Sequence, residues 1–285
     1  MVPVLLVTGG SGFLGRALVT RGAAAWRVAF TYAHGEPEEL PAVAYRLDVR
    51  DAEACRRVFE AVRPDVVIHT VIPKDEAEFD EVIVRGSGHV AVQAGAGRAR
   101  LVHVSTDMVF DGEHAPYDED AIPRPITAYG RAKAEAEKQV TAAGPGAVIA
   151  RVPLLYGLDP PDPRGARMAK DVEAGTPVTL FTDERRCPAE VGDVAQALLE
   201  VARRLLAHDA LPPVLHLVGP EVLTRWEFGT SFLEALGLST QGVRALPLAE
   251  SGLVRPRDLT LVCRRTPAEL TRGIRSFAAV AAALR

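Results

Sequence analysis

A glycine-rich segment near the start of the chain constrains the fold more than any other feature. Residues 8–15 read Thr-Gly-Gly-Ser-Gly-Phe-Leu-Gly, directly after a short apolar run and directly before a helical pattern. This glycine spacing lets the backbone approach a pyrophosphate, lets the helix pack closely on the strand and points the helix N-terminus at the phosphates. The segment therefore predicts a dinucleotide-binding turn. The residues expected to contact the dinucleotide here are Gly9, Gly12, Phe13, Leu14 and Gly15.

Short apolar runs alternate with helical patterns throughout the first half of the chain. The expected strands are Val2–Val7, Arg27–Tyr32, Val43–Leu47, Val66–Val71, Leu101–Ser105 and Ala147–Val152. The expected helices are Arg16–Ala25, Ala52–Val62, Phe79–Ala94 and Thr127–Ala142. Because the strands are rich in Val, Ile and Leu on both faces, we expect a parallel sheet covered by helices on both sides, an α/β fold of the Rossmann type.

The pattern loosens after about residue 153. Residues 159–165 form a loop by composition, 193–208 an amphipathic helix, and Val214–Val218 a strand that returns to the main sheet. Thr224 is the expected N-cap of a helix that runs to Leu236. We therefore expect a dinucleotide-binding domain in residues 1–152, to which 183–219 return. Residues 153–182 and 220–285 would form a smaller substrate-binding lobe.

Composition narrows the classes of partner. The chain has 285 residues, 48% of them hydrophobic, and a formal net charge of −4. With no block of like charge, it favours neither nucleic acid nor an anionic membrane as a partner, and no apolar run is long enough to cross a bilayer. Three widely spaced cysteines are typical of reduced thiols in a cytoplasmic protein. The seven histidines form no cluster with ligand spacing, so we expect no metal site.

A tyrosine and a lysine four residues apart, Tyr129 and Lys133, share one face of an expected helix. An ammonium beside a phenol stabilises the phenolate, so we expect Lys133 to lower the pKa of Tyr129 toward working pH. Only four of the 33 basic residues are lysines, which favours a need for a compact ammonium at this position. Tyr129 would then exchange a proton with a carbonyl/alcohol pair. The alternative is a solvated lysine beside a helix tyrosine.

Residues at the ends of three expected strands are candidates for contact with the cofactor. The second strand ends around Thr31 without an Asp or Glu for a ribose 2′-hydroxyl, which favours NADP(H) while leaving NAD(H) compatible. Asp48, with Val49 beside it, is placed either to contact adenine or to cap the following helix. Thr70, at the end of the fourth strand, is a further candidate contact with the cofactor.

Ser105, Thr106 and Asp107 end the fifth expected strand. In open α/β folds ligands bind at this carboxyl edge of the sheet. A hydroxyl at this position would hydrogen-bond a substrate carbonyl that Tyr129 protonates. Alternatively, the two hydroxyls only satisfy backbone groups at the strand end.

These motifs together resemble the extended short-chain dehydrogenase/reductase superfamily, and within it the dTDP-4-dehydrorhamnose reductase family. The regulatory β-subunit of methionine adenosyltransferase is a relative of that family. The resemblance covers essentially the whole chain and is most specific between residues 105 and 133. The segments that carry it are Ser105–Gly112, Pro116–Asp120, Tyr129–Lys133, Arg151–Gly157, Pro188–Val194 and Arg255–Arg257.

The resemblance implies the NADP-dependent reduction of the 4-keto group of a nucleotide-linked deoxysugar. It implies that Tyr129 donates the proton to the C4 oxygen, that Lys133 holds the nicotinamide ribose, and that Thr106 orients the carbonyl. The implied substrate contacts are Ser105, Leu154, Arg255 and Arg257. The two arginines fall where a guanidinium could meet the substrate diphosphate, although both could equally be surface residues.

Several departures from the family pattern leave alternatives open. Met108 stands where the family usually has tyrosine, Ile83 where it commonly has asparagine, and Leu154 where the reductases often have tryptophan. These changes favour a second hypothesis, an NADP-binding regulatory subunit with little or no turnover. Asp107 leaves room for a related epimerase or dehydratase. The helices 79–94 and 127–142 could form a homodimer face or could only pack on the sheet.

Overall fold

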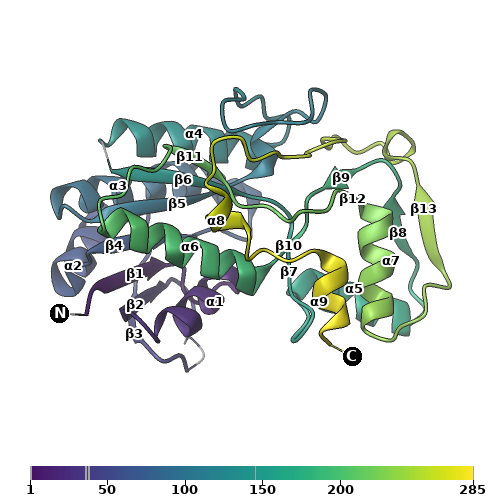
Figure 1. Cartoon of the computed structure of the whole chain (residues 1–285), viewed down its shortest axis with the longest axis horizontal. Helices are drawn as coiled ribbons and strands as arrows, with labels where there is room; N and C mark the ends of the chain where they lie inside the picture. The colour runs from purple at the N-terminus through teal and green to yellow at the C-terminus, as the bar shows by residue number, and fades with distance from the viewer. Residues whose placement is uncertain (1, 36, 38, 145, 285) are drawn as a thin grey trace.

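A computed structural model describes residues 2–35, 37, 39–144 and 146–284, and at its centre lies a seven-stranded parallel sheet (Figure 1). The strands are β1 (Val4–Thr8), β2 (Arg27–Tyr32), β3 (Val43–Arg46), β4 (Val66–His69), β5 (Arg100–Thr106), β6 (Ala147–Val152) and β11 (Val214–His216). Their spatial order is β11-β6-β5-β4-β1-β2-β3, so the strand order reverses between β1 and β4. The predicted Rossmann-type fold is confirmed, and ligands bind such sheets at this switch point.

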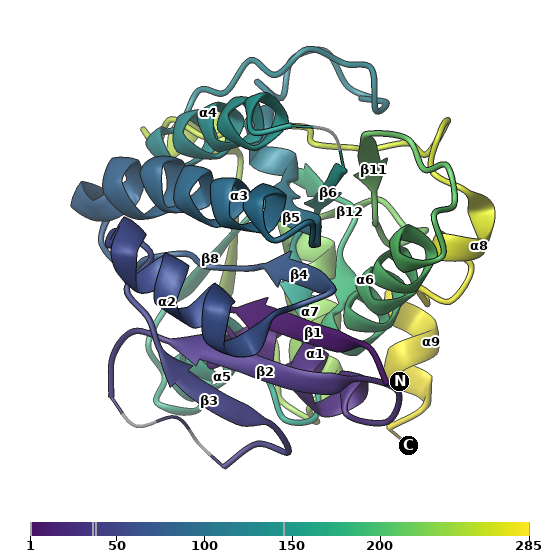
Figure 2. The same cartoon turned by 90° about the vertical axis from the view of Figure 1, so that its left-hand side faces the viewer.

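Helices cover both faces of the sheet (Figure 2). One face carries α1 (Phe13–Gly22) and α6 (Val191–Leu206), and the other carries α2 (Ala52–Val62), α3 (Gly86–Ala96) and α4 (Ala128–Ala142). All five residues of β1 are buried as a result. Burial on both faces explains why the strands read as continuous apolar runs without alternation.

Two helices differ from their expected bounds by more than two residues at one end or at both. α1 begins at Phe13, earlier than the expected Arg16, because the glycine turn leads directly into its first turn. The expected helix 79–94 is divided into a π-helical segment, η2 (Phe79–Arg85), and α3. The change comes at Gly86, where a Cβ would lie 2.6 Å from Val49 Cγ2. Close packing on the loop after β3 thus accompanies the wide turn, and π-helical turns of this kind often occur at functional sites.

The chain returns to the sheet after residue 190. β11 pairs in parallel with β6, as the sequence predicted for Val214–Val218. The return begins with α6, whereas the expected segment also included 183–190. Those residues instead form two short strands outside the main sheet, β9 (Arg185–Arg186) and β10 (Ala189–Glu190). Two-residue strands without apolar alternation give no periodic signal in the sequence.

A smaller part of the chain lies beside the carboxyl edge of the sheet (Figure 1). Its elements are β7 (Leu155–Tyr156), α5 (Pro163–Glu173), β8 (Val178–Phe181), β12 (Leu223–Thr224), α7 (Arg225–Ala235), β13 (Val243–Leu246) and α9 (Phe277–Ala282). Thr224 caps α7 in a capping box with Glu227, as expected. An aromatic cluster of Tyr156, Phe228, Phe232 and Phe277 forms its core. α8 (Ala268–Thr271) runs back to pack against α6.

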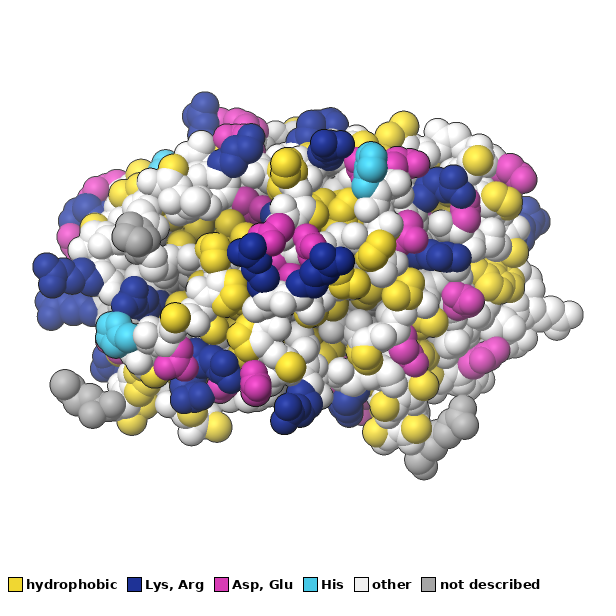
Figure 3. All heavy atoms as spheres, turned by 45° about the horizontal axis from the view of Figure 1, so that its top comes forward, with side chains coloured by type: hydrophobic (Ala, Val, Ile, Leu, Met, Phe, Trp, Pro, Cys, Tyr) yellow, Lys and Arg dark blue, Asp and Glu magenta, His cyan; other side chains and the backbone are white. Residues whose placement is uncertain are grey.

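Charged side chains of both signs are interspersed over the face in Figure 3, with hydrophobic side chains between them. This mixture matches the small net charge of −4. None of the helices in the described ranges combines the length and the apolar character that crossing a bilayer requires.

A buried ion pair ties α4 to the sheet. Arg151 on β6 donates to both carboxylate oxygens of Glu137 on α4, at 3.0 Å from Nε and 2.8 Å from Nη2. Ser105 on β5 donates its hydroxyl to the same carboxylate at 2.5 Å. The two charged side chains are only 4% and 7% exposed. Because each charge compensates the other away from water, losing one alone leaves a buried charge without its partner.

We expect Glu137→Gln to lower the free energy of unfolding by about 3–5 kcal/mol, because it leaves Arg151 uncompensated. Urea denaturation measures this value. Glu135→Gln is the matched control: it makes the same change on the same helix, where the Glu135 side chain is 44% exposed and pairs with Lys138. The control should change stability by about 1 kcal/mol or less. Equal effects of the two substitutions would contradict this account of the pair.

Candidate functional site

A cleft of about 1490 Å³ runs along the carboxyl edge of the sheet and is also lined by the smaller part of the chain. Pockets for one drug-sized ligand measure about 300–1,000 Å³, so this cleft has room for a dinucleotide and a second molecule. The predicted cofactor contacts that line it are Gly9, Gly12, Phe13, Leu14, Gly15, Thr31, Asp48, Val49, Thr70 and Lys133. The other predicted residues that line it are Ser105, Thr106, Tyr129, Leu154 and Arg255. The cleft thus brings together all the predicted site residues except Arg257.

Close backbone contacts require glycine in the turn between β1 and α1. Gly9 has a φ of +80°, which side chains rarely tolerate. A Cβ on Gly15 would lie 2.2 Å from the carbonyl oxygen of Gly9. The Gly9 amide donates to Thr31 Oγ1 at 3.2 Å, and Thr70 Oγ1 donates to the Thr8 carbonyl at 2.9 Å. These contacts hold the turn against the ends of β2 and β4, and the resulting cradle at a helix N-terminus fits a pyrophosphate.

At the end of the cleft predicted to hold the adenine, Asp48 belongs to a group of ion-paired side chains. Arg50 donates to Asp48 Oδ2 at 2.7 Å and to Glu78 Oε1 at 3.0 Å. The hydrogen bond from Arg50 holds the pKa of Asp48 below its ordinary value. The N-cap of α2 is Asp51, whose carboxylate accepts from the amides of residues 53 and 54, so the N-cap alternative for Asp48 is wrong. Sequence reasoning did not identify Arg50 as a cleft residue.

Thr106, Tyr129 and Lys133 meet where the end of β5 faces the first turns of α4. The Thr106 hydroxyl lies close enough to Tyr129 to lower the pKa of the phenol by hydrogen bonding to its ionised form. Thr106 Oγ1 also lies 3.2 Å from Asp107 Oδ1 and can donate its single proton to only one of these partners at a time. Lys133 is fully buried, and its Nζ donates to the Val104 carbonyl oxygen at 2.9 Å.

The expected lowering of the tyrosine pKa is wrong. Burial raises the pKa of Tyr129 above its ordinary value and the charge of Asp107 adds to this effect, whereas the Thr106 hydrogen bond opposes it. Lys133 directs its ammonium at Val104, and burial lowers its own pKa to about 8. The cost of desolvating a phenolate therefore outweighs any stabilisation by the lysine. Tyr129 keeps its proton at neutral pH, which suits a proton donor.

Two predicted substrate contacts, Ser105 and Arg257, have carboxylate partners within the protein. The Ser105 hydroxyl is used within the core, where it donates to Glu137. The Arg257 guanidinium lies outside the cleft lining, 3.5 Å from an Asp183 carboxylate oxygen, with 59% of its side chain exposed. In both cases a carboxylate distant in sequence takes up the side chain, and local sequence carries no sign of such a partner. Leu154 lines the cleft as expected.

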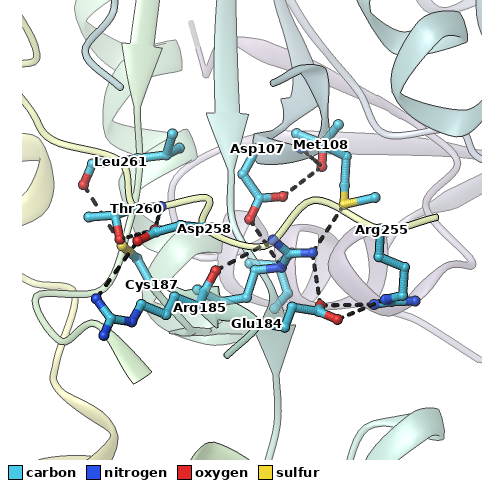
Figure 4. Close-up of polar contacts among 12 residues, drawn as sticks. Asp107, Met108, Glu184, Arg185, Cys187, Arg255, Asp258, Thr260 and Leu261 are labelled. Carbon is cyan, nitrogen blue, oxygen red and sulfur yellow. Dashed lines mark hydrogen bonds and ion pairs between the residues drawn. The ribbon is translucent and has the colours of Figure 1, made fainter. Parts of the chain in front are cut away.

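A network of charged side chains, in which sequence reasoning missed Glu184 and Arg186, occupies the cleft end nearer the smaller part of the chain (Figure 4). Dashed lines from Asp107, Met108 and Glu184 converge on one guanidinium, that of Arg186. Arg186 lies 3.8 Å from Asp107 and 2.9 Å from Glu184, and it donates to the Met108 sulfur at 3.3 Å. Arg255 holds Glu184 from the other side at 2.7 and 2.9 Å. Met108, one of the departures from the family pattern, thus accepts a hydrogen bond from this arginine.

Asp107 stays buried in this network, with 3% of its surface exposed. Burial raises the pKa of its carboxyl, and the charge of Arg186 offsets part of that rise. The sequence signal for Glu184 and Arg186 is the run of charged residues at 183–186. In a chain this rich in arginine, that signal does not distinguish a cleft residue from a surface one.

Comparisons with known proteins agree with the geometry. The family described as "RmlD substrate binding domain" matches residues 3–284. Methionine adenosyltransferase 2 subunit beta of Xenopus tropicalis is 30% identical over 285 residues, and the match covers 91% of this chain and 80% of the relative. The probable low-salt glycan biosynthesis reductase Agl14 of Haloferax volcanii is 29% identical over 279 residues, covering 93% of this chain and 91% of the relative.

A solved structure shows the same fold. The dTDP-4-dehydrorhamnose reductase of Bacillus anthracis in complex with NADP has a TM-score of 0.81 at 20% identity, and the match covers 100% of this chain and 99% of that one. At this identity the likeness establishes the fold, while the family match extends over nearly every residue. The chain belongs to the RmlD substrate-binding-domain family.

Proposed function

We propose that this protein reduces the 4-keto group of a nucleotide-linked deoxysugar with NADPH. The observation that carries the proposal is that Thr106, Tyr129 and Lys133 share one cleft with a glycine cradle that fits a pyrophosphate. The relatives support the reaction class: the Bacillus anthracis neighbour is a dTDP-4-dehydrorhamnose reductase with bound NADP, and the Haloferax volcanii relative is a probable reductase.

The cofactor would lie along the glycine cradle, with its adenosine end toward Asp48 and its nicotinamide end toward Lys133. When bound, the reduced nicotinamide supplies the hydride. The end of β2 presents Thr31 to His34 to the cleft without any carboxylate, so a 2′-phosphate meets no repulsion from this strand. This supports NADPH over NADH, with NADH as the weaker alternative.

The chain supplies the proton and the orientation. Tyr129 holds its proton at neutral pH and would donate it to the oxygen that develops negative charge at C4. Thr106, which lines the cleft with Tyr129, would orient that oxygen. Lys133 carries its charge below about pH 8 and would favour the phenolate that proton donation leaves behind. We assign Tyr129 as the general acid on this basis.

A regulatory subunit with little or no turnover is the second candidate. The relatives named methionine adenosyltransferase 2 subunit beta favour it. Ile83 favours it as well. This fully buried side chain packs with Ala132 and Ala136 against Tyr129, so it places no polar group beside the phenol. This candidate predicts tight NADP(H) binding without sugar reduction. The epimerase or dehydratase alternative is weaker, because Asp107 is tied to Arg186 and is not free to act on a sugar C5 proton.

We propose the cytoplasm as the compartment and a homodimer as the assembly. Cys55 and Cys187 are buried and Cys263 is exposed, and all three are free thiols, which supports a reducing cytoplasm. The interface of the homodimer would be the outer faces of α3 and α4. Light scattering of the purified protein would show the dimer by its mass.

Tyr129→Phe should lower kcat for ketosugar reduction by about 10²–10⁴-fold, because it removes the general acid. Binding of NADPH should stay unchanged, because the glycine cradle is intact. Steady-state rates and fluorescence titration measure the two quantities. A variant that reduces the sugar at nearly the wild-type rate would rule out Tyr129 as the acid.

The wild-type kcat/KM should fall as pH rises through about 8. Burial disfavours the Lys133 ammonium and lowers its pKa to about 8 from 10.5, so the charged form is present below pH 8 and lost above it. Lys133→Arg keeps its charge throughout this range, so the residual activity of that variant should show no such limb. A flat wild-type profile between pH 7 and 9.5 would contradict the assignment.

A further inference from the structure

The Arg50 guanidinium, at the adenine end of the cleft, is held by its edges. Its Nε donates to Asp48 Oδ1 at 3.0 Å, its Nη2 to Asp48 Oδ2 at 2.7 Å, and its Nη1 to Glu78 Oε1 at 3.0 Å. All the N–H bonds of a guanidinium lie in its plane, so these contacts fix the plane without using its two faces. The side chain lines the cleft and is 39% exposed, so a bound molecule can reach it.

Arg50 connects two segments that leave the sheet at different strands. Asp48 follows β3, whereas Glu78 belongs to η1 (Glu76–Glu78), the short helix that follows β4. β1 and β2 lie between these two strands in the sheet. The guanidinium is therefore a flat bridge between two segments that both line the cleft.

The carboxylate of Asp48 is already used by Arg50. Oδ1 accepts from the backbone amide of Arg50 as well as from its Nε, and Oδ2 accepts from Nη2. The hydrogen bond from the Arg50 side chain is the largest cause that holds the pKa of Asp48 below its ordinary value. The amino group of an adenine would have to compete with this charged donor for Asp48, whereas a face of the guanidinium is open to the ring.

We propose that Arg50 packs a face of its guanidinium against the adenine ring of the cofactor, while Asp48 and Glu78 hold that guanidinium in place. A guanidinium plane stacks favourably on the face of an aromatic ring. Ile72 lines the same cleft with 53% of its surface exposed and offers apolar contact to the same flat ring. The inference rests on the proposed cofactor and is independent of whether a sugar is reduced.

The charge balance distinguishes a neutral ring from a phosphate as the group beside Arg50. Two carboxylates compensate the single positive charge of this side chain. A 2′-phosphate would add a third anionic group and would be repelled by both carboxylates, whereas a neutral ring meets no such repulsion. Arg50 should therefore support the binding of NADP⁺ and NAD⁺ equally.

Titration of the purified protein with NADP⁺, NAD⁺ and nicotinamide mononucleotide tests the contact, by calorimetry for the dinucleotides and by NMR for the mononucleotide. Arg50→Met keeps an unbranched stem but removes the plane, and it should weaken both dinucleotides about 3- to 10-fold. The mononucleotide lacks the adenosine half and should bind as before. Arg50→Lys keeps the charge without the plane, so it should show the same loss. Arg57→Met is the matched control, because Arg57 is 59% exposed on α2, outside the cleft lining.

Etheno-NADP⁺ separates a contact with the ring face from a contact with the ring edge. Its etheno bridge joins N1 to the 6-amino nitrogen and leaves both faces of the base. Arg50→Met should therefore weaken this analogue by the same factor as NADP⁺. If Arg50 acted only by orienting Asp48 toward the amino group, the loss would disappear with the analogue.

Each outcome decides the proposal. An equal loss of NADP⁺ and NAD⁺ in Arg50→Met supports it when the loss persists with the etheno analogue and in Arg50→Lys. Unchanged NADP⁺ affinity, a loss confined to NADP⁺, recovery in Arg50→Lys, or an equal loss of the mononucleotide or in Arg57→Met would overturn it. If the wild type reduces no ketosugar but the Arg50 effect is present, the reaction assignment falls and the adenine contact stands. If reduction is observed and Arg50→Met binds NADP⁺ like the wild type, the contact falls and the reaction stands.

Discussion

The close packing of α4 on the end of β5 is the constraint on which the site depends. A Cβ on Gly130 would lie 2.1 Å from the Met108 carbonyl oxygen, so only glycine lets the helix approach the strand end this closely. The same approach buries Lys133 and Glu137 on one helix face and sets Tyr129 against Thr106. The positions of Tyr129, Thr106 and the buried Lys133 ammonium therefore depend on one helix–strand contact.

Burial at that contact has opposite effects on the two ionisable groups. It keeps Tyr129 protonated and makes Lys133 easier to deprotonate. Both shifts suit a site that gives a proton to a substrate and then holds the resulting phenolate beside a cation. The departure at Met108 belongs to a different feature: its sulfur accepts a hydrogen bond from Arg186, which links the segment after β5 to Glu184.

The fold was largely predictable because its signals are local and periodic. β2, β6 and α2 have the bounds that their apolar patterns predicted, and β11 was found by its return to the sheet. The glycine turn and the strand-end residues were likewise predictable, because parallel strands bring their carboxyl ends to one edge. Glu184 and Arg186 were not, since their importance comes from partners distant in sequence. The pKa of Tyr129 was predicted in the wrong direction because spacing reveals neighbours but not the desolvation that burial imposes.

The central claim is that this cleft transfers a hydride and a proton to the C4 carbonyl of a nucleotide-linked sugar. The most direct test is to incubate the purified protein with deuterated NADPH and a dTDP-4-keto-6-deoxyhexose made in place. The deuterium lies at nicotinamide C4, and the isotopomer labelled on each face is used in turn. We predict one deuterium at C4 of the product from one of the two isotopomers, detected by mass spectrometry and NMR. Bound NADPH with no deuterium in the sugar from either isotopomer would contradict the account and favour the regulatory alternative.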